Sequence, residues 1–357
     1  MATVPPSVSL LDLAPPEAAR ALADWVAAEG LPLYRVGQIA ARLWQRPVGA
    51  WEEATDLPKA LREKLSARWP IPRLTLATRQ VSQDGTRKYL WRLADGESVE
   101  SVLIPSGSRR TLCISSQAGC ALGCVFCATG MMGFRRNLTP FEIAGQAREL
   151  LLESPPEKPT NIVFMGMGEP LLNWDSVDVA LTILNSPEGL GVGARHITVS
   201  TVGIIPGMRK LAERPEQFRL AISLHAANPA RRLPLMPIEK KYKLADVLEA
   251  AAAFRKRITF EYVLIAGRND SESDAAELAS LARRMGAMVN LLPLHPGGAP
   301  GLTPTPPARI REFAEQLRVR GVEAVVRRSR GLDISAACGQ LKVEVERKRP
   351  QQPAIPE

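Results

Sequence analysis

Three of the five cysteines in this 357-residue chain stand together in one glycine-rich stretch. Cys120, Cys124 and Cys127 follow a C-x-x-x-C-x-x-C spacing, so their thiolates can converge on one metal centre. A structural zinc site takes four ligands, usually as paired C-x-x-C motifs, and the sequence offers no second pair. A 4Fe-4S cluster has four irons, so three thiolates leave one iron open to a ligand that is not protein. The stretch predicts such a cluster, against the alternative of three buried cysteines that serve only as small apolar residues.

Two further cysteines stand apart from this loop. Cys113 lies just before it in an apolar run, and Cys338 lies far along the chain in the stretch AACGQ. For an isolated cysteine with apolar neighbours a structural role has the better prior. A pair of reactive thiols near a radical centre is the alternative, and the spacing does not choose between the two.

The composition predicts a soluble globular protein of the cytoplasm. Apolar residues make up 45% of the chain, and no apolar run approaches the roughly 18 residues that cross a bilayer. The N-terminus lacks the apolar core of a signal peptide, and a reducing compartment would keep the clustered thiols free. A net charge of +9 indicates a polyanionic partner, although many solvated surfaces are also basic.

Hydrophobic periodicity divides the chain into four parts. Residues 1–73 show helical spacing and predict a small helical domain, and residues 74–105 alternate as strands do and predict a β-hairpin connector. Turns at Asp84-Gly85 and Asp95-Gly96 separate the strands of this connector. Residues 106–345 are expected to form an α/β domain, and residues 346–357 a disordered tail.

Strands and helices alternate from residue 110 onward. Strands are predicted at 111–115, 161–165, 196–201, 220–223, 258–265, 288–292 and 322–326, and helices at 140–153, 174–185, 206–213, 244–255, 272–285 and 308–319. Such βα repetition predicts a parallel sheet, either open or rolled into a partial barrel. Thr139, with Pro140 and Glu142, forms a capping-box sequence that begins the helix after the cysteine loop.

Polar residues recur where these predicted strands end, which is the functional rim of a βα barrel. They are Gly168 and Glu169, Ser200, Ser223 with Leu224 and His225, and His295. Gly168 lets backbone approach a ligand closely, and Glu169 can accept from an amino group. Each also has a structural explanation, as a turn, a helix cap or a hydrogen-bonded histidine, but their shared location favours a binding site.

Several stretches together resemble the RlmN/Cfr family of radical-SAM RNA adenine methyltransferases. Besides the cysteine loop they are MGMGEPLLN (165–173), ISLHA (222–226), PIEKKY (237–242), TFEYVL (259–264) and RGLDISAACGQL (330–341), and the match runs from about residue 8 to 342. The resemblance implies a partial (βα)6 barrel preceded by an accessory RNA-recognition domain. It also implies that Cys120, Cys124 and Cys127 hold one 4Fe-4S cluster, whose open iron takes S-adenosylmethionine.

The same resemblance implies roles for the other candidate residues. Gly168, Glu169, Ser200, Ser223, Leu224, His225 and His295 match positions that hold S-adenosylmethionine, two molecules of which are used per turnover. Family members usually carry asparagine where this chain has His295, which can still donate one hydrogen bond. Cys338 matches the cysteine that becomes S-methylated, Cys113 its later disulfide partner, and Glu100 the proton acceptor.

The activity that the resemblance implies is methylation of C2 of an adenine in 23S rRNA, with the adenine 3′ of the tRNA anticodon as a second substrate. Pro170 after Gly168-Glu169 favours this branch, because the branch that methylates C8 resembles Gly-Glu-Ala there. C8 methylation, the same chemistry on another RNA, and a non-catalytic iron-sulfur RNA-binding protein are the alternatives. Expected partners are RNA and an electron donor such as flavodoxin or ferredoxin, with no membrane, and the protein is expected to be a monomer.

Overall fold

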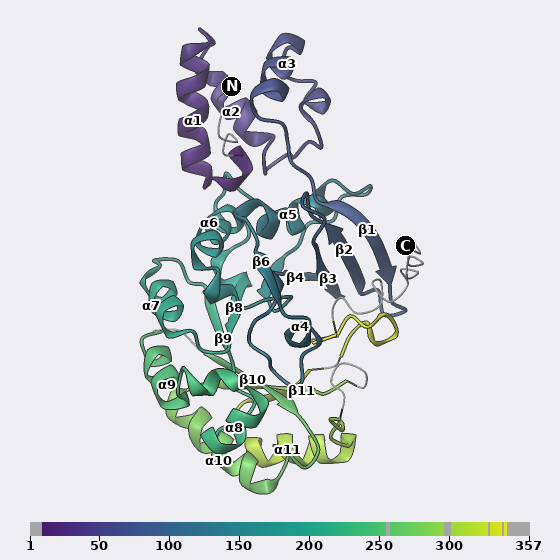
Figure 1. The fold of residues 1–357 in the computed structure, drawn as a ribbon, viewed down its shortest axis with the longest axis vertical. Helices are drawn as coiled ribbons and strands as arrows, with labels where there is room; N and C mark the ends of the chain where they lie inside the picture. Colours follow the sequence, from purple (N-terminus) through teal and green to yellow (C-terminus); the bar gives the residue numbers. More distant parts are fainter. Residues whose placement is uncertain (1–8, 255–257, 296–300, 328, 338, 341–357) are drawn as a thin grey trace, which may run out of the picture.

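Helices at the N-terminus sit above a long curved sheet in the computed structural model, which describes residues 9–254, 258–295, 301–327, 329–337 and 339–340 (Figure 1). The N-terminal helices are η1 (Leu10–Asp12), α1 (Pro15–Ala28), α2 (Tyr34–Ala41), η2 (Trp51–Glu53) and α3 (Lys59–Arg68). Their apolar positions, among them Leu22, Val26 and Ile39, are fully buried, as helical periodicity predicts. The predicted tail 346–357 lies outside the described residues, and the domain boundaries stay predictions.

In the described part of the chain, ten strands form one sheet in the order β1-β2-β3-β4-β7-β8-β9-β10-β11-β12. The first four are antiparallel: β1 (Thr75–Val81), β2 (Arg87–Arg92), β3 (Ser98–Ser106) and β4 (Arg109–Cys113). From β4 onward neighbours are parallel: β7 (Asn161–Phe164), β8 (Ile197–Thr201), β9 (Arg219–Ser223), β10 (Thr259–Leu264), β11 (Met288–Pro293) and β12 (Ala324–Val326). The predicted βα alternation is therefore confirmed, and the predicted connector strands continue the barrel sheet through β4.

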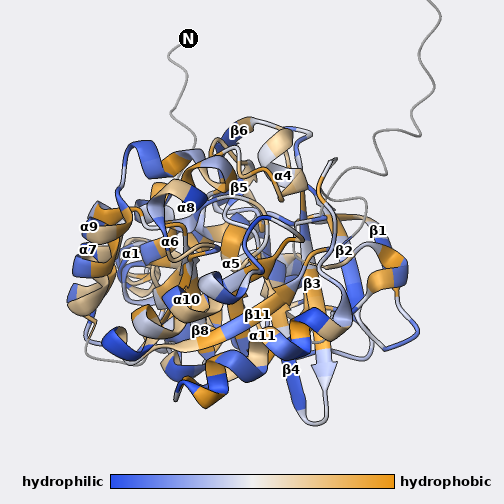
Figure 2. Cartoon of the chain, turned by 90° about the horizontal axis from the view of Figure 1, so that it is seen from below, coloured by the Kyte–Doolittle hydropathy of each residue, from blue (hydrophilic) through white to orange (hydrophobic). Residues whose placement is uncertain are grey.

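Helices connect the parallel strands and lie against the sheet, with hydrophilic residues on their outer sides and apolar residues concentrated on the strands (Figure 2). They are α5 (Pro140–Leu151), α6 (Trp174–Asn185), α7 (Ile205–Glu213), α9 (Leu244–Ala252), α10 (Glu272–Met285) and α11 (Pro307–Val319), close to the predicted ranges. At the start of α5 both halves of the capping box form, since Glu142 N donates to Thr139 Oγ1 at 3.2 Å and Thr139 N donates to the Glu142 carboxylate at 2.9 Å.

Helix α5 also joins the barrel to the N-terminal helices. Its Arg148 is fully buried and donates to Leu43 O and Val48 O, both at 2.7 Å. Phe141 N donates to the Asp12 carboxylate at 3.0 Å, across the same junction. Because a buried guanidinium without partners is costly, these bonds fix the helical domain against the barrel.

Two short strands and two short α-helices were not predicted from the sequence: β5 (Gln117–Gly119), β6 (Phe134–Asn137), α4 (Ala128–Met131) and α8 (Pro229–Leu235). The first three lie in or beside the glycine-rich cysteine loop, where the sequence has no regular apolar period. Helix α8 contains Pro234, which by itself indicates a break. Among the helices of the described residues, none combines the length and the apolar character that a membrane crossing requires.

Candidate active site

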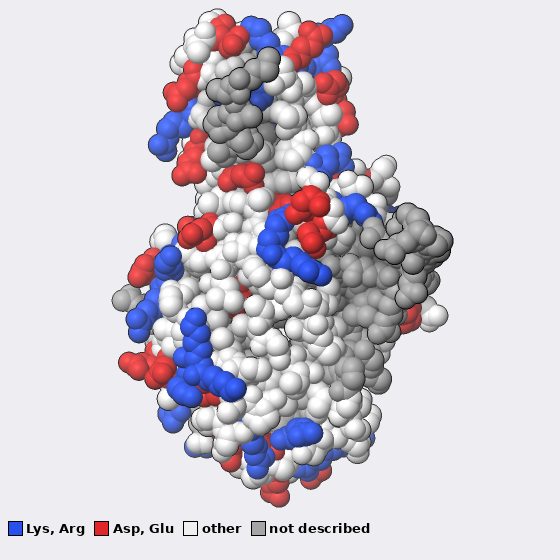
Figure 3. Space-filling model, viewed as in Figure 1, with Lys and Arg blue, Asp and Glu red and all other residues white. Residues whose placement is uncertain are grey.

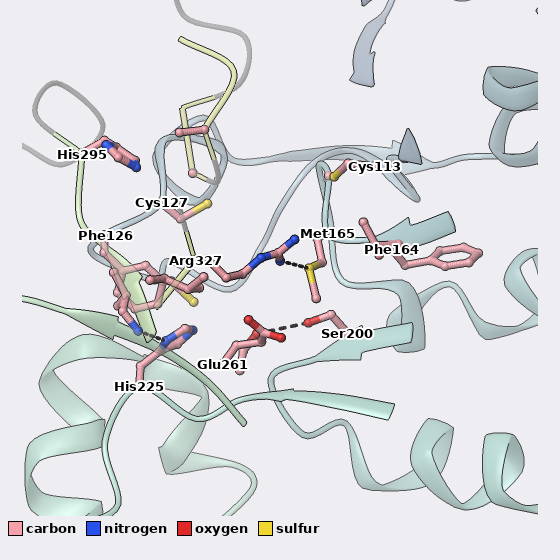
Figure 4. Close-up of a pocket in the computed structure, with 18 of the residues that line it drawn as sticks. Cys113, Phe126, Cys127, Phe164, Met165, Ser200, His225, Glu261, His295 and Arg327 are labelled. Atoms are coloured by element: carbon pink, nitrogen blue, oxygen red, sulfur yellow. Dashed lines mark hydrogen bonds between the residues drawn. The ribbon is translucent and has the colours of Figure 1, made fainter. Parts of the chain in front are cut away.

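A cavity of about 260 Å³ opens where the parallel strands end. Ten of the sequence-predicted site residues line it together: Cys113, Cys120, Cys124, Cys127, Gly168, Glu169, Ser200, Ser223, His225 and His295 (Figure 4). Among the described residues, the cavity wall does not include Leu224 or Glu100. The strand-end location inferred from sequence is therefore one continuous site.

The cysteine loop is pinned at its base by the short β5–β6 ladder. Gly119 pairs with Phe134 and has φ +76°, and a Cβ at this position would collide with the carbonyl oxygen of Gly133. Cys120 N donates to that same oxygen at 3.0 Å, and Cys127 N donates to Cys124 O at 3.1 Å. The backbone thus curls so that all three cysteines reach the cavity.

The three thiols are soft donors in a mostly apolar setting, which fits an iron-sulfur cluster. Burial, with the neighbouring Cys127 adding to it, raises the pKa of Cys124 well above its usual range, and burial raises the pKa of Cys120 to about 11. A metal bound to these thiols would lower their pKa values and release the protons. Within the described residues, no three His, Cys, Asp or Glu side chains are close enough to hold a single metal ion. A cluster that gives each thiolate its own iron does not require them to be.

Gly168 and Glu169 tie the loop after β7 to its neighbours. Gly168 has φ +95°, and a Cβ there would lie 2.5 Å from Gln117 Cβ, so only glycine fits. The Glu169 carboxylate accepts from Leu171 N at 3.0 Å and from Val202 N at 2.9 Å. Burial raises the pKa of Glu169 to about 7, although these backbone donors act to lower it. The carboxylate lines the cavity, where a ligand amino group could donate to it.

Ser200 and Ser223 end neighbouring strands β8 and β9, and their hydroxyl oxygens lie 3.4 Å apart. His225, just beyond, is buried with φ +56°, and its Nδ1 accepts from Val263 N at 3.0 Å. That bond assigns the proton of the neutral ring to Nε2. Burial, helped by the charge of Arg232, lowers the pKa of His225 to about 3, so the ring stays neutral. His225 is therefore both a backbone anchor and part of the cavity wall.

His295 replaces the asparagine usual in the resembled family. It follows β11 and lines the cavity, and its Nε2 lies 2.6 Å from Ser329 Oγ. Burial lowers the pKa of His295. With Nε2 paired to a serine hydroxyl, Nδ1 is the ring atom left to meet a ligand.

Cys338 lies outside the described residues, but its neighbours meet the cysteine loop. Ala336, Ala337 and Gly339 line the same cavity. Ala128 N donates to Gly339 O at 2.7 Å, and a Cβ on Gly339 would lie 3.1 Å from Phe126 O. The C-terminal segment and the cysteine loop therefore meet at one rim of the cavity.

Glu100 occupies a buried position on β3, the strand whose Val102 and Ile104 line the cavity. Its carboxylate lies 3.8 Å from Lys88 Nζ, and both side chains are less than a tenth exposed. Lys88 Nζ also donates to Ser335 O at 3.3 Å, three residues before Cys338. A buried ammonium thus connects the expected proton acceptor to the segment that carries the expected methyl carrier.

Sequence reasoning missed one charged residue of the cavity, Glu261, which lines it together with Arg327 and Arg330. Arg327 reaches inward, with Nη1 3.9 Å from Met165 Sδ. Glu261 stands in the apolar run TFEYVL of β10, and a lone carboxylate in a buried strand is the signal that could have found it.

Comparisons with known proteins identify the family of this chain. The Radical SAM superfamily profile matches residues 114–282, the part of the chain that carries the cysteine loop and most of the barrel. A protein from Gemmatimonas aurantiaca named probable dual-specificity RNA methyltransferase RlmN is 59% identical over 94% of this chain and 93% of its own length. An Anaeromyxobacter protein named dual-specificity RNA methyltransferase RlmN is 48% identical, over 93% of this chain and 90% of its own.

A solved structure leads to the same family. The crystal structure of a radical SAM methyltransferase from Sphaerobacter thermophilus superposes with a TM-score of 0.86 at 43% identity, over 93% of this chain and 98% of the other. Similarity at this level extends over the N-terminal helices and the barrel alike. The chain therefore belongs to the RlmN family of the radical SAM superfamily.

Proposed function

We propose that this protein methylates C2 of an adenine in 23S rRNA and of the adenine 3′ of the tRNA anticodon. One observation carries the proposal: the cysteine loop, the strand-end polar residues and the neighbours of Cys338 line a single cavity. The relatives' names, RNA methyltransferases of dual specificity, support RNA as the substrate. They do not favour C8 methylation or a non-catalytic RNA-binding role.

In this proposal Cys120, Cys124 and Cys127 hold one 4Fe-4S cluster, and Gly168, Glu169, Ser200, Ser223, Leu224, His225 and His295 bind or position S-adenosylmethionine, two molecules per turnover. Leu224 contributes through its backbone, because its carbonyl accepts from the buried Arg232 at 3.2 Å and holds the loop of Ser223 and His225. When bound, the cluster supplies the electron that opens radical chemistry. Burial of the site excludes water from that chemistry.

Cys338 is the proposed carrier of the methyl group, Cys113 its disulfide partner, and Glu100 the group that takes the ring proton. C2 of adenine is electron-poor and has no lone pair, so it does not attack an electrophilic methyl group directly. A thiol that holds the methyl group close to the ring provides another route. Cys113 and the neighbours of Cys338 line the same cavity, which supports the proposed pairing.

Three further expectations stay predictions: an electron donor such as flavodoxin or ferredoxin, a monomeric state, and a cytoplasmic location. On the face drawn in Figure 3, Lys and Arg are interspersed with Asp and Glu. Among the described ion pairs, Arg136 pairs with both Asp95 and Glu142. The charge of this face therefore does not single out an RNA-binding patch.

Mass spectrometry of nucleosides from 23S rRNA and tRNA tests the proposal directly. A strain that lacks the gene should lose 2-methyladenosine from both RNAs, and a plasmid copy should restore it, whereas a Cys338→Ala copy should not. Unchanged 2-methyladenosine in both RNAs would refute the proposal. Loss of 8-methyladenosine instead would identify the enzyme as a C8 methyltransferase.

A further inference from the structure

Glu261 is a buried carboxylate in the floor of the cavity. Its strand β10 lies between β9 and β11, and in the register Glu261 is level with Ser223 on one side and Asn290 on the other. Asn290 Nδ2 donates to Glu261 Oε1 at 2.9 Å and so fixes the orientation of the carboxylate. Glu261 is only 3% exposed, yet it lines the cavity together with Ser200 and Arg327 (Figure 4).

The second carboxylate oxygen, Oε2, has no hydrogen-bond partner among the described residues. A buried acceptor without a partner is unusual, because its desolvation is not compensated. Glu261 is only 3% exposed, so bulk water does not readily replace the missing hydrogen bond. An acceptor held rigidly on one side and open on the cavity side is suited to a donor that arrives with a ligand.

The surroundings of Glu261 favour a neutral donor over a cation. Burial raises the pKa of Glu261, and the charge of Arg327, which lines the same cavity, opposes that rise by Coulombic attraction. A ligand ammonium would meet repulsion from this guanidinium. The hydroxyl pair of Ser200 and Ser223, 3.4 Å apart, adds groups that both donate and accept. A carboxylate acceptor beside such hydroxyls matches the hydroxyl groups of a sugar.

We propose that Glu261 Oε2 accepts a hydrogen bond from a ribose hydroxyl of a nucleoside bound in the cavity. The proposal rests on the proposed function, which brings two nucleosides to the site, the adenosyl group of S-adenosylmethionine and the target adenosine of RNA. The depth of Glu261 in the cavity floor favours the adenosyl group.

Binding of S-adenosylmethionine analogues that lack the 2′ or the 3′ hydroxyl tests the inference. Holoenzyme is reconstituted anaerobically in a Cys338→Ala background, so that transfer to Cys338 does not consume the ligand, and binding is followed by equilibrium dialysis. One deoxy analogue should bind about 10- to 100-fold more weakly than S-adenosylmethionine, as expected for a hydrogen bond to a charged acceptor. In Glu261→Met the same analogue and S-adenosylmethionine should bind with equal affinity, because the acceptor of the hydrogen bond is gone.

Two comparisons complete the experiment. Glu249→Met makes the same substitution at an exposed site on α9 and should keep the wild-type penalty for the analogue. Binding of RNA with 2′-deoxyadenosine at the methylated position is measured in the same way. If only this RNA binds more weakly than its ribose counterpart, and the difference disappears in Glu261→Met, the ribose that contacts Glu261 belongs to RNA.

The inference is overturned if protein with an intact Glu261 binds every deoxy ligand as tightly as the ligand with all its hydroxyls. This result does not depend on whether the Glu261→Met variant folds. It is also overturned if Glu261→Met retains the full penalty. In both cases S-adenosylmethionine still binds and the proposed function stands. If the wild-type holoenzyme binds no S-adenosylmethionine, the proposed function itself fails and the inference fails with it.

Discussion

The segment that leads to Cys338 is held by the turn between β1 and β2. The Asp84 carboxylate accepts from Gly331 N at 3.1 Å and lies 3.8 Å from Arg330 Nη1. In the opposite direction, Asp333 accepts from Ser82 Oγ at 2.6 Å and from Gln83 N at 3.2 Å. We call this set of contacts the hairpin clasp. Because the segment has little regular structure, we expect the clasp to decide how often it leaves the cavity.

Replacing Asp84 by alanine should loosen the segment without unfolding the barrel. A hydrogen bond to a charged group contributes about 1.5–3 kcal/mol when buried. The Asp84 side chain is 29% exposed, so solvent reduces this to about 1 kcal/mol, or roughly a fivefold larger opening constant. The amides of residues 331–337, among them Ala336 N, which donates to Gly331 O at 2.9 Å, should exchange faster by that factor.

Hydrogen–deuterium exchange followed by mass spectrometry measures this effect, with peptides from β8 and β9 as an internal reference. Asp95→Ala is the matched control, since Asp95 lies in the neighbouring hairpin turn and pairs with Arg136 instead of the C-terminal segment. Unchanged exchange at 331–337 in Asp84→Ala, or an equal increase in the control, would refute the role of the clasp.

The clasp also has a predictable pH dependence. Burial alone would raise the pKa of Asp84, but hydrogen bonds from Thr86 and Gly331 outweigh it and lower the pKa to about 2. A carboxyl whose pKa is lower in the folded state stabilises that state above its unfolded pKa, near 3.9. This contribution is lost as pH falls through about 2, so protection of the segment should be constant from neutral pH down to about pH 4 and fall below it.

Three further variants test the rest of the site. Lys88→Met should lower the free energy of unfolding by about 3 kcal/mol in urea titrations, because it removes the ammonium beside the buried Glu100 carboxylate. Adding Glu100→Gln should recover most of this loss, and no recovery would argue against the ion pair. Gly168→Ala places a Cβ 2.5 Å from Gln117 Cβ at φ +95°, so thermal unfolding should show a loss of about 2 kcal/mol and dialysis weaker S-adenosylmethionine binding; wild-type binding would contradict the close-approach role. Cys124→Ala should abolish iron incorporation on anaerobic reconstitution while the far-ultraviolet circular dichroism stays unchanged, and full iron content would exclude Cys124 as a ligand.

The sequence by itself determined the order and type of the main elements. Hydrophobic periodicity is a local property, and the strands and helices predicted from it between 111 and 326 lie close to the observed barrel elements, whereas β5, β6, α4 and α8 were not predicted. The C-x-x-x-C-x-x-C loop and the polar residues at the strand ends can also be recognised from neighbouring residues in the sequence alone. Parallel strands then bring their carboxyl ends to one rim, which is why the sequence predicts Gly168, Ser200 and Ser223 in one site.

Only the tertiary structure decided how these residues are paired. The tautomer of His225 follows from Val263 N, 38 positions away, and both Glu169 oxygens are engaged by backbone donors, one of them from the next βα loop. The open oxygen of Glu261 is visible only once Asn290 is seen to occupy the other. The hairpin clasp joins residues about 250 positions apart. Hydrogen-bond satisfaction and burial are sums over neighbours from distant parts of the chain, and no local pattern of sequence records them.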